Sequence, residues 1–249
     1  MLHDRTILVT GAGRGLGREI ALALAKQGAK LILADIDSES GNETQALINS
    51  SGGSARFNAV DLGDPKSIEK LADNISKNEF VLHGLVNNGA IATGLGGVPF
   101  DQIDIDTWDK VMQVNIRGLW LMTRAVAPML AKSGTGRIVN IASDTALWGA
   151  PNLLSYVASK GAVIAMTHSL ARELGPQNTG VVAVAPGILT TQSTEYVPRE
   201  RHQHYESGRA VPGPQSPQDV LGTVAFLLTE DALTLTGQVL PVNRGFVFK

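Results

Sequence analysis

The sequence predicts an α/β protein with a doubly wound, seven-stranded parallel sheet and helices on both of its faces. Strand-like and helical segments alternate along the chain, which is the order that parallel sheets require. The early strand-like segments are almost entirely apolar, as expected when helices cover both faces of a sheet. A glycine-rich segment also joins the first strand to the first helix.

Seven apolar segments are predicted as strands: residues 6–10, 30–34, 55–60, 84–87, 137–141, 181–185 and 238–242. Helical patterns between them include residues 15–27, 65–77, 107–132, 153–174 and 217–228. The last helix is marked by Ser216 as N-cap, Pro217 at the first helical position and Asp219 in the first turn. Because α/β chains of 249 residues often fold as one unit, residues 1–249 are predicted to form a single domain.

The composition favours a protein that acts on small molecules. Lys and Arg number 21 against 23 Asp and Glu, and the formal charge of -2 gives no reason to expect a nucleic acid or an anionic membrane as partner. The chain has no cysteine, which excludes disulfides and thiolate catalysis and suits a reducing compartment. No apolar run reaches the roughly 18 residues of a membrane span. We therefore expect an untargeted, cytoplasmic protein.

The glycine-rich segment, residues 10–17, predicts a site for the pyrophosphate of a dinucleotide. It places backbone N–H groups and the positive end of a helix beside a prospective phosphate. Asp35 ends the second strand, 18 residues after Gly17, where a carboxylate accepts hydrogen bonds from ribose hydroxyls and repels a 2'-phosphate. NAD is therefore expected rather than NADP, although Arg14 in the loop could pair with a 2'-phosphate. A purely structural strand-to-helix turn is the alternative.

A hydroxyl, a phenol and an amine are spaced to meet at one carbonyl oxygen. Tyr156 and Lys160 stand one helical turn apart on the same face, and Ser143 precedes the tyrosine by 13 residues. Because a nearby ammonium group favours the phenolate, we expect Lys160 to lower the pKa of Tyr156 from about 10 and to suit it to general acid/base work. Taken alone, each residue has a structural alternative, such as a capped strand end for Ser143.

The ordered set of motifs resembles the short-chain dehydrogenase/reductase family over essentially the whole chain. The motifs are Thr10 to Gly17, Asp61-Leu62, Asn87-Asn88, Asn115, Ser143, Tyr156 with Lys160, and Pro186-Gly187. The resemblance implies a Rossmann-like fold, hydride transfer and the catalytic set Asn115, Ser143, Tyr156 and Lys160. In that set Tyr156 exchanges a proton with the substrate oxygen and Ser143 positions that oxygen. Lys160 binds the nicotinamide ribose, and Asn115 supports a water that passes protons to solvent.

The resemblance also implies the cofactor contacts Gly11, Arg14, Gly15, Leu16, Gly17, Asp35, Ile36, Asp61, Leu62, Asn88, Gly89, Tyr156, Lys160, Pro186, Gly187, Ile188 and Thr190. Asp61 would contact the adenine, with a turn-forming role as the alternative. Of the two asparagines 87 and 88, Asn87 is expected to lie closest to the cofactor. The chain departs from the family pattern at Gly89-Ala90, which is reversed, at Val182 and at Asn243-Arg244-Gly245, which replaces Asp-Gly-Gly.

The segment after Ser143 and a lid at about residues 189–213 are expected to enclose the substrate. The first segment offers apolar side chains for a ring or an alkyl chain, namely Ala146, Leu147, Trp148 and Leu153, although Trp148 could instead be a core or subunit contact. The lid residues Arg199, Arg201, His202, His204, Tyr205 and Arg209 could bind a carboxylate. Glu195, Glu200 and Glu206 lie among them and favour a solvated surface instead. Two histidines are a weak metal signal, and no metal is expected.

The expected activity is reversible hydride transfer between NAD(H) and a secondary alcohol or its ketone, with oxidation favoured by the preference for NAD. A 3-oxoacyl thioester reductase that uses NADPH shares the catalytic residues and is one alternative. A non-catalytic NAD-binding regulator is another, but it would have no need of the catalytic set. The family's homotetramer, or a homodimer, is the expected assembly, and the sequence does not identify the particular alcohol.

Overall fold

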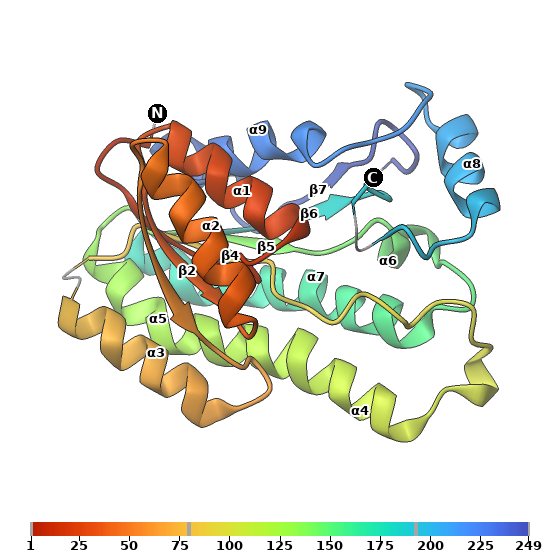
Figure 1. Ribbon diagram of the computed structural model, residues 1–249, viewed down its shortest axis with the longest axis horizontal. Helices are drawn as coiled ribbons and strands as arrows, with labels where there is room; N and C mark the ends of the chain where they lie inside the picture. Colours follow the sequence, from red (N-terminus) through yellow and green to blue (C-terminus); the bar gives the residue numbers. More distant parts are fainter. Residues whose placement is uncertain (1, 79–80, 192–193, 249) are drawn as a thin grey trace.

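The computed structural model describes residues 2–78, 81–191 and 194–248, and its sheet confirms the predicted fold class (Figure 1). The strands are β1 (Thr6–Thr10), β2 (Lys30–Asp35), β3 (Ser54–Ala59), β4 (Gly84–Asn87), β5 (Arg137–Ile141), β6 (Gly180–Pro186) and β7 (Val239–Val242). In this part of the chain they form one seven-stranded parallel sheet in the order β3-β2-β1-β4-β5-β6-β7. Every predicted strand boundary lies within one residue of the observed boundary.

Helices cover both faces of the sheet (Figure 1). On one face lie α1 (Gly15–Lys26), α2 (Ser38–Ser50) and α9 (Gln218–Leu227), and on the other lie α3 (Pro65–Asn78), α5 (Leu119–Lys132) and α7 (Leu154–Leu174). A buried apolar cluster that includes Ile20 and Val224 joins the sheet to the first group, and a second cluster with Ile68 and Val126 joins it to the other. Burial on both faces explains why β1 is apolar along nearly all of its length.

The long helix predicted over residues 107–132 is divided in the structure. α4 (Ile105–Met112) continues into a π-helical turn, η2 (Gln113–Gly118), before α5 begins at Leu119. The backbone stays in the right-handed helical region at both junctions. The prediction of one continuous helix was therefore wrong, because a π turn changes the hydrogen-bond spacing without any break that a hydrophobic pattern would mark.

Besides the four-residue α6 (Thr145–Trp148), two longer described helices fall where the sequence pattern indicated none. α2 buries only Gly41, Thr44 and Ile48, so its apolar stripe is weak, and it begins at Asp37, whose side chain accepts from the N–H groups of Glu39 and Ser40. α8 (Arg199–Gly208) lies within the predicted lid and buries only Tyr205. Both helices therefore lack the apolar periodicity on which sequence-based prediction depends.

The start of α9 differs in detail from the prediction. The helix begins at Gln218, and the N-cap position is held by Pro217 without a side-chain hydrogen bond. Ser216 does not cap the helix; instead its N–H donates to Asp219 Oδ2 at 2.8 Å. Asp219, in the first turn, therefore holds the segment that leads into the helix. The sequence had assigned the capping role to Ser216 instead.

The loops that follow β1, β4, β5 and β6 meet at the carboxyl edge of the sheet. β1 and β4 lie side by side at the point where the strand order reverses, and open α/β sheets bind ligands in the crevice at this position. The short helix α6 (Thr145–Trp148) and α8 lie near each other beyond the sheet (Figure 1). None of the helices in the described residues is long and apolar enough to cross a membrane.

Candidate functional site

The glycine loop between β1 and α1 is closely packed against the loop after β4. Gly11 has a φ of +63°, and a Cβ on this residue would lie 2.7 Å from Gly89 Cα. A Cβ on Gly17 would lie 1.9 Å from Gly11 O. Asn88 Nδ2 donates to the carbonyls of Thr10 and Gly11, both at 3.1 Å. Glycine is therefore needed at both positions, because a Cβ would collide with the neighbouring backbone.

Asp35 lies beside this loop, as the sequence predicts. Its Oδ2 accepts from Gly13 N–H at 2.8 Å and its Oδ1 accepts from Asp37 N–H at 3.0 Å. Arg14 is exposed at the start of α1, and Ile36 is 69% exposed beyond the end of β2. Asp35 therefore has a structural partner in the loop in addition to any ligand, a contact that residue spacing alone did not indicate.

Two further residues support the loop and were not identified from the sequence. Arg18 Nε donates to Gly13 O at 2.8 Å, and Thr44 Oγ1 of α2 donates to the same carbonyl at 3.2 Å. Arg18 Nη2 also pairs with Glu43 at 2.6 Å. Sequence reasoning missed them because an arginine and a threonine on helices carry no motif, and the burial of Thr44 is seen only in the structure.

The structure corrects the expected order of the two asparagines after β4. Asn87 is buried, and its Nδ2 donates to Thr123 Oγ1 at 3.0 Å and Asn140 Oδ1 at 2.9 Å. It therefore points into the protein, and Asn88 is the residue that contacts the glycine loop. Gly89, in the reversed pair, is tightly placed, since a Cβ there would lie 2.7 Å from Leu62 Cδ1.

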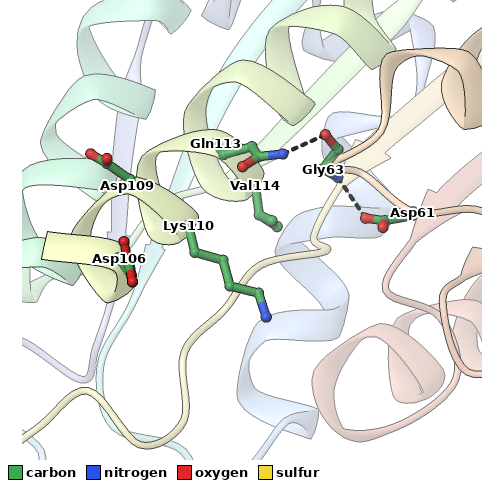
Figure 2. Close-up of a pocket in the computed structure, with 7 residues that line it drawn as sticks. All are labelled: Asp61, Gly63, Asp106, Asp109, Lys110, Gln113 and Val114. Carbon is green, nitrogen blue, oxygen red and sulfur yellow. Dashed lines mark hydrogen bonds between the residues drawn. The ribbon is translucent and has the colours of Figure 1, made fainter. Parts of the chain in front are cut away.

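Asp61 and Leu62 border the same region from the loop after β3. Asp61 is exposed, and its Oδ1 accepts from Gly63 N–H at 2.7 Å, so it does form the turn that was the alternative interpretation. Figure 2 shows the adjoining hollow of about 340 Å³, in which Asp61, Lys110 and Val114 lie on the walls. Gln113 Nε2 donates to Gly63 O at 2.7 Å and fixes the far side of the turn. The exposed carboxylate remains free to face a ligand beside this hollow.

Ser143, Tyr156 and Lys160 come together at the carboxyl end of β5. Lys160 Nζ is buried, donates to Ile141 O at 2.7 Å and lies 5.6 Å from the centre of the Tyr156 ring. Burial raises the pKa of the Tyr156 phenol to about 12, and a hydrogen bond with Ser143 opposes this rise. Burial lowers the pKa of Lys160 to about 8. The expected lowering of the Tyr156 pKa by Lys160 is therefore wrong for the chain on its own: burial raises this pKa, and the opposing contact is the bond with Ser143.

Asn115 lies in the π turn and joins three parts of the site. Its Oδ1 accepts from Ile91 N–H at 2.7 Å, and its Nδ2 donates to Ile91 O at 2.9 Å and to Ser159 Oγ at 3.1 Å. Ser159 Oγ in turn donates to Tyr156 O at 2.7 Å. Asn115 is therefore buried and fully bonded, and it holds the loop after β4 against the helix that carries Tyr156 and Lys160.

β6 ends at Pro186, and the loop after it contains Gly187, Ile188 and Thr190 and continues into the predicted lid. Ile188 O accepts from Arg209 Nη2 at 2.9 Å, and Thr190 N–H donates to Gln215 O at 2.8 Å, while the Thr190 side chain is exposed. Within the lid of residues 189–213, Gln192 and Ser193 lie outside the described residues. Arg209 is buried, so it does not present its charge to a substrate carboxylate.

The lid helix α8 packs against the segment that follows Ser143 through aromatic rings. Trp148 and Phe246 both contact Tyr205 and His204, and the Tyr205 and Phe246 rings are stacked with 4.2 Å between their centres. Trp148 Nε1 donates to Tyr205 Oη at 3.0 Å. Trp148 is therefore a contact to the lid. Among the described residues, no group of three or more His, Cys, Asp or Glu side chains could hold a metal ion.

The residues present fit a dinucleotide at this edge of the sheet. Gly11 and Gly17 let the loop pack against its neighbours without a side chain, and the loop leads into the N-terminus of α1, where backbone N–H groups suit a phosphate. Asp35 stands at the end of β2 for the adenosine ribose, whereas the nicotinamide would lie toward Tyr156, Lys160 and Ile188. The arrangement can therefore place a redox cofactor beside a phenol that exchanges protons.

Comparisons with known proteins agree with this geometry. A family model described as enoyl-(acyl carrier protein) reductase matches residues 11–247. The chain is 34% identical over 251 residues to a cyclopentanol dehydrogenase of Comamonas sp. (strain NCIMB 9872), with 98% of each chain covered. It is 30% identical over 246 residues to a 3-oxoacyl-(acyl-carrier-protein) reductase of Thermotoga maritima, with 99% of each covered.

Solved structures agree as well. A protein of Beutenbergia cavernae, assigned provisionally as an NAD(P)-dependent gluconate 5-dehydrogenase and holding NADP at low occupancy, superposes with a TM-score of 0.91. It is 33% identical, and the match covers 98% of this chain and 97% of that one.

Proposed function

The chain belongs to the short-chain dehydrogenase/reductase family of oxidoreductases, and on that basis we propose that it interconverts a secondary alcohol and its ketone with NAD(H). In the oxidative direction an alcohol and NAD⁺ give a ketone, NADH and one proton. The cofactor, when bound, accepts or supplies the hydride. The protein must therefore position the carbinol carbon, move the hydroxyl proton and exclude competing chemistry.

Tyr156 is proposed as the group that exchanges this proton. In reduction its neutral phenol donates to the ketone oxygen, and a pKa raised to about 12 keeps it protonated at neutral pH. In oxidation the phenolate must accept the hydroxyl proton, so deprotonation has to come first. Lys160, whose pKa burial lowers to about 8, is the adjacent group that can lose and regain a proton near neutral pH.

Ser143 and Asn115 are proposed to prepare the site around that proton transfer. The Ser143 hydroxyl accepts from Thr145 Oγ1 at 2.9 Å and bonds with the Tyr156 phenol, so it is oriented toward the same substrate oxygen. Asn115 fixes Ile91 and, through Ser159, the Tyr156 backbone. The proposed water-mediated relay would run from Lys160 toward Asn115, which is joined to the Tyr156 backbone through Ser159.

For the cofactor we propose NAD, held by Gly11, Gly15, Leu16 and Gly17 at the pyrophosphate and by Asp35 at the adenosine ribose. Asp35 supports this choice because an ionised carboxylate beside a 2'-phosphate dianion repels it. Exposed Ile36 and Arg14, together with Asp61, Leu62, Asn88 and Gly89, would surround the adenosine. Pro186, Gly187, Ile188 and Thr190 would contact the nicotinamide end, with no metal involved.

The observation that carries the proposal is the convergence of the Ser143 hydroxyl, the Tyr156 phenol and the buried Lys160 amine. We expect Tyr156→Phe to reduce turnover by about 10²- to 10⁴-fold, the usual contribution of general acid/base catalysis. NADH formation from a panel of cyclic, aromatic and hydroxy-acid alcohols measures turnover, and NADH fluorescence measures cofactor binding, which should change little. Near-normal turnover by this variant would reject the role of Tyr156.

The choice between NAD and NADP has its own test. Asp35→Ala should raise the ratio of NADP to NAD use because it removes the repelling charge. Asp35→Asn is the matched control for structure, since it keeps one oxygen for the Gly13 N–H while removing the charge. Both variants should shift the ratio in the same direction. An unchanged ratio in both would count against Asp35 as the determinant.

A 3-oxoacyl thioester reductase is the second candidate, and the Thermotoga maritima relative is the observation that favours it. A cofactor titration separates the two functions, because the reductase alternative expects a preference for NADPH. Failure to reduce or oxidise any compound in the panel with either cofactor would instead favour a regulator that binds NAD without catalysis.

We also propose that the chain forms a homotetramer or homodimer and acts in the cytoplasm on a small molecule. Large apolar side chains support self-association: Trp120 on α5, Phe226 on α9 and Phe248 near the C-terminus are 44%, 42% and 78% exposed. Light scattering after size exclusion chromatography gives the mass of the assembly directly. The absence of cysteine supports a reducing compartment.

A further inference from the structure

Asp144 follows Ser143 directly and is fully buried, yet no step of the proposed reaction uses it. Its Oδ1 accepts from Tyr205 Oη at 2.9 Å, and its Oδ2 accepts from Asn243 Nδ2 at 3.2 Å. Tyr205 belongs to the lid helix α8, and Asn243 follows β7. One side chain therefore connects the peptide that carries Ser143 with the lid and with the C-terminal segment.

Tyr205 is the buried residue by which α8 is attached to the segment after Ser143. It is 1% exposed and is the one buried residue of this helix. Its hydroxyl donates to Asp144 and accepts from Trp148 Nε1, while its ring stacks on Phe246. The remaining surface of α8 is polar. Arg201 also binds Pro151 O at 3.0 Å, so loss of the Tyr205 contacts would loosen the helix while leaving it partly held.

The side chain at position 144 must accept two hydrogen bonds, one from Tyr205 and one from Asn243. Asn243 Oδ1 accepts from the N–H groups of Gly245 at 3.1 Å and Phe246 at 3.2 Å, which fixes Asn243 Nδ2 toward Asp144. Asp144 thus faces two donors, a phenol and an amide, and a carboxylate can accept from both. Burial raises the pKa of Asp144 to about 6, so the carboxylate is still mostly ionised at neutral pH.

The same geometry favours an amide at position 243. An aspartate here would place a second carboxylate oxygen about as close to Asp144 as the present 3.2 Å contact. Two buried like charges at this separation repel strongly. The asparagine at 243 therefore matches the carboxylate at 144, and the two positions act as a pair.

We propose that Asp144 and Tyr205 are positioning residues, which fix the lid helix to the peptide of Ser143 so that closure over the substrate and placement of the Ser143 hydroxyl are set together. This inference rests on the proposed function, because it assigns the lid to the alcohol or ketone of that reaction. Neither residue touches the reacting atoms in this role. Their removal should therefore affect the use of substrate more than the binding of NADH.

An exchange of the pair tests the inference. In Asp144→Asn the new side-chain amide at position 144 faces the amide of Asn243. Asn243 cannot turn its oxygen toward position 144, because two backbone N–H groups hold that oxygen. In Asn243→Asp the new carboxylate at position 243 faces the carboxylate of Asp144. The double variant restores every bond: the new amide at position 144 donates to the new carboxylate at position 243 and accepts from Tyr205, while that carboxylate also accepts from the two backbone N–H groups. Tyr205→Phe removes both bonds of the phenol, the one to Asp144 and the one from Trp148 Nε1, and leaves Asp144 with Asn243 unchanged. Ser207→Ala, on the exposed side of α8, is the matched control.

We expect each of the two single variants at 144 and 243, and Tyr205→Phe, to lower kcat/KM by about tenfold or more, the effect of one buried unsatisfied hydrogen-bonding group. NADH binding, measured by fluorescence, should change less than kcat/KM, because none of the three substituted side chains is a proposed cofactor contact, although Asp144 borders Pro186 and Gly187. The double variant should recover most of the loss. Hydrogen–deuterium exchange of residues 199–208 should rise in the single variants and fall again in the double variant.

The inference is overturned if the single variants have the same kcat/KM and the same hydrogen–deuterium exchange in α8 as the unchanged protein. It is also overturned if a folded double variant has a kcat/KM no higher than that of the single variants. Thermal melting shows whether each variant folds. If the double variant does not fold, Tyr205→Phe decides alone, and unchanged kcat/KM with unchanged α8 exchange rejects the inference. If the unsubstituted protein oxidises no alcohol, the proposed function fails. Hydrogen–deuterium exchange of α8 in the variants still shows whether Asp144 holds the lid.

Discussion

Replacement of Asn115 by alanine should destabilise the fold as well as impair the site. The side chain makes three hydrogen bonds, two of them with the N–H and C=O of Ile91 at 2.7 and 2.9 Å. Alanine cannot replace any of these bonds. The variant therefore leaves one backbone donor and one backbone acceptor in the loop after β4 without their protein partner.

The expected size of the effect follows from the number of these groups and from their exposure. An unsatisfied buried group costs about 1–3 kcal/mol, and Ile91 is partly exposed, so water can reach it and the lower part of that range applies to each group. We therefore expect the free energy of unfolding to fall by about 2–4 kcal/mol in Asn115→Ala. Ser159 keeps its own bond to Tyr156 O and adds little to this loss.

Urea denaturation followed by tryptophan fluorescence, at one fixed protein concentration, measures this change. Gln113→Ala is the matched control, because it lies in the same π turn and loses one bond at an exposed position. We expect less than about 1 kcal/mol there. If Asn115→Ala unfolds within about 1 kcal/mol of the unchanged protein, the loop after β4 does not depend on Asn115, and the structural part of its assigned role is wrong.

Three further outcomes are expected. Gly17→Ala should weaken NADH binding at least tenfold by fluorescence titration, because its Cβ would lie 1.9 Å from Gly11 O, whereas Gly222→Ala, with no atom within 4 Å, should bind NADH normally. The kcat/KM for alcohol oxidation should rise as the pH increases from about 6 toward 9, since Tyr156 must lose its proton before it can accept one; a flat profile would contradict this. The folded pKa of Asp144 is above its unfolded value, so its stability contribution is present at low pH and lost as the pH rises through about 6. In urea denaturation the unfolding free energy of the unchanged protein relative to Asp144→Asn should therefore increase by up to about 3 kcal/mol from about pH 8 to about pH 4, and no change would show that Asp144 titrates normally.

The sheet was predictable from the sequence because burial on both faces makes its strands continuous apolar segments. β1 and β6 illustrate this, since every one of their residues is buried. α8 was not predictable, because a helix that buries one tyrosine carries no apolar period. The π turn was hidden for a different reason, namely that its backbone remains helical throughout.

The site was predictable where its chemistry follows a fixed spacing. Tyr156 and Lys160 share a helix face, and Asp35 ends a strand next to the glycine loop, so local geometry places them. The contacts of Asp144 were not predictable, since its two partners lie 61 and 99 residues away in the sequence. The pKa of Tyr156 also depends on burial, which spacing does not report.

The site depends on the number of residues in the π turn 113–118. Each residue of an α-helix advances the direction of its side chain by roughly 100°, so an added or deleted residue here would rotate all of α5 relative to α4. At present Asn115 faces Ile91 while Trp120, five positions later, reaches the surface. A one-residue deletion between them would misdirect one or the other even if every remaining side chain were kept. The count of residues in this turn therefore matters as much as their identity.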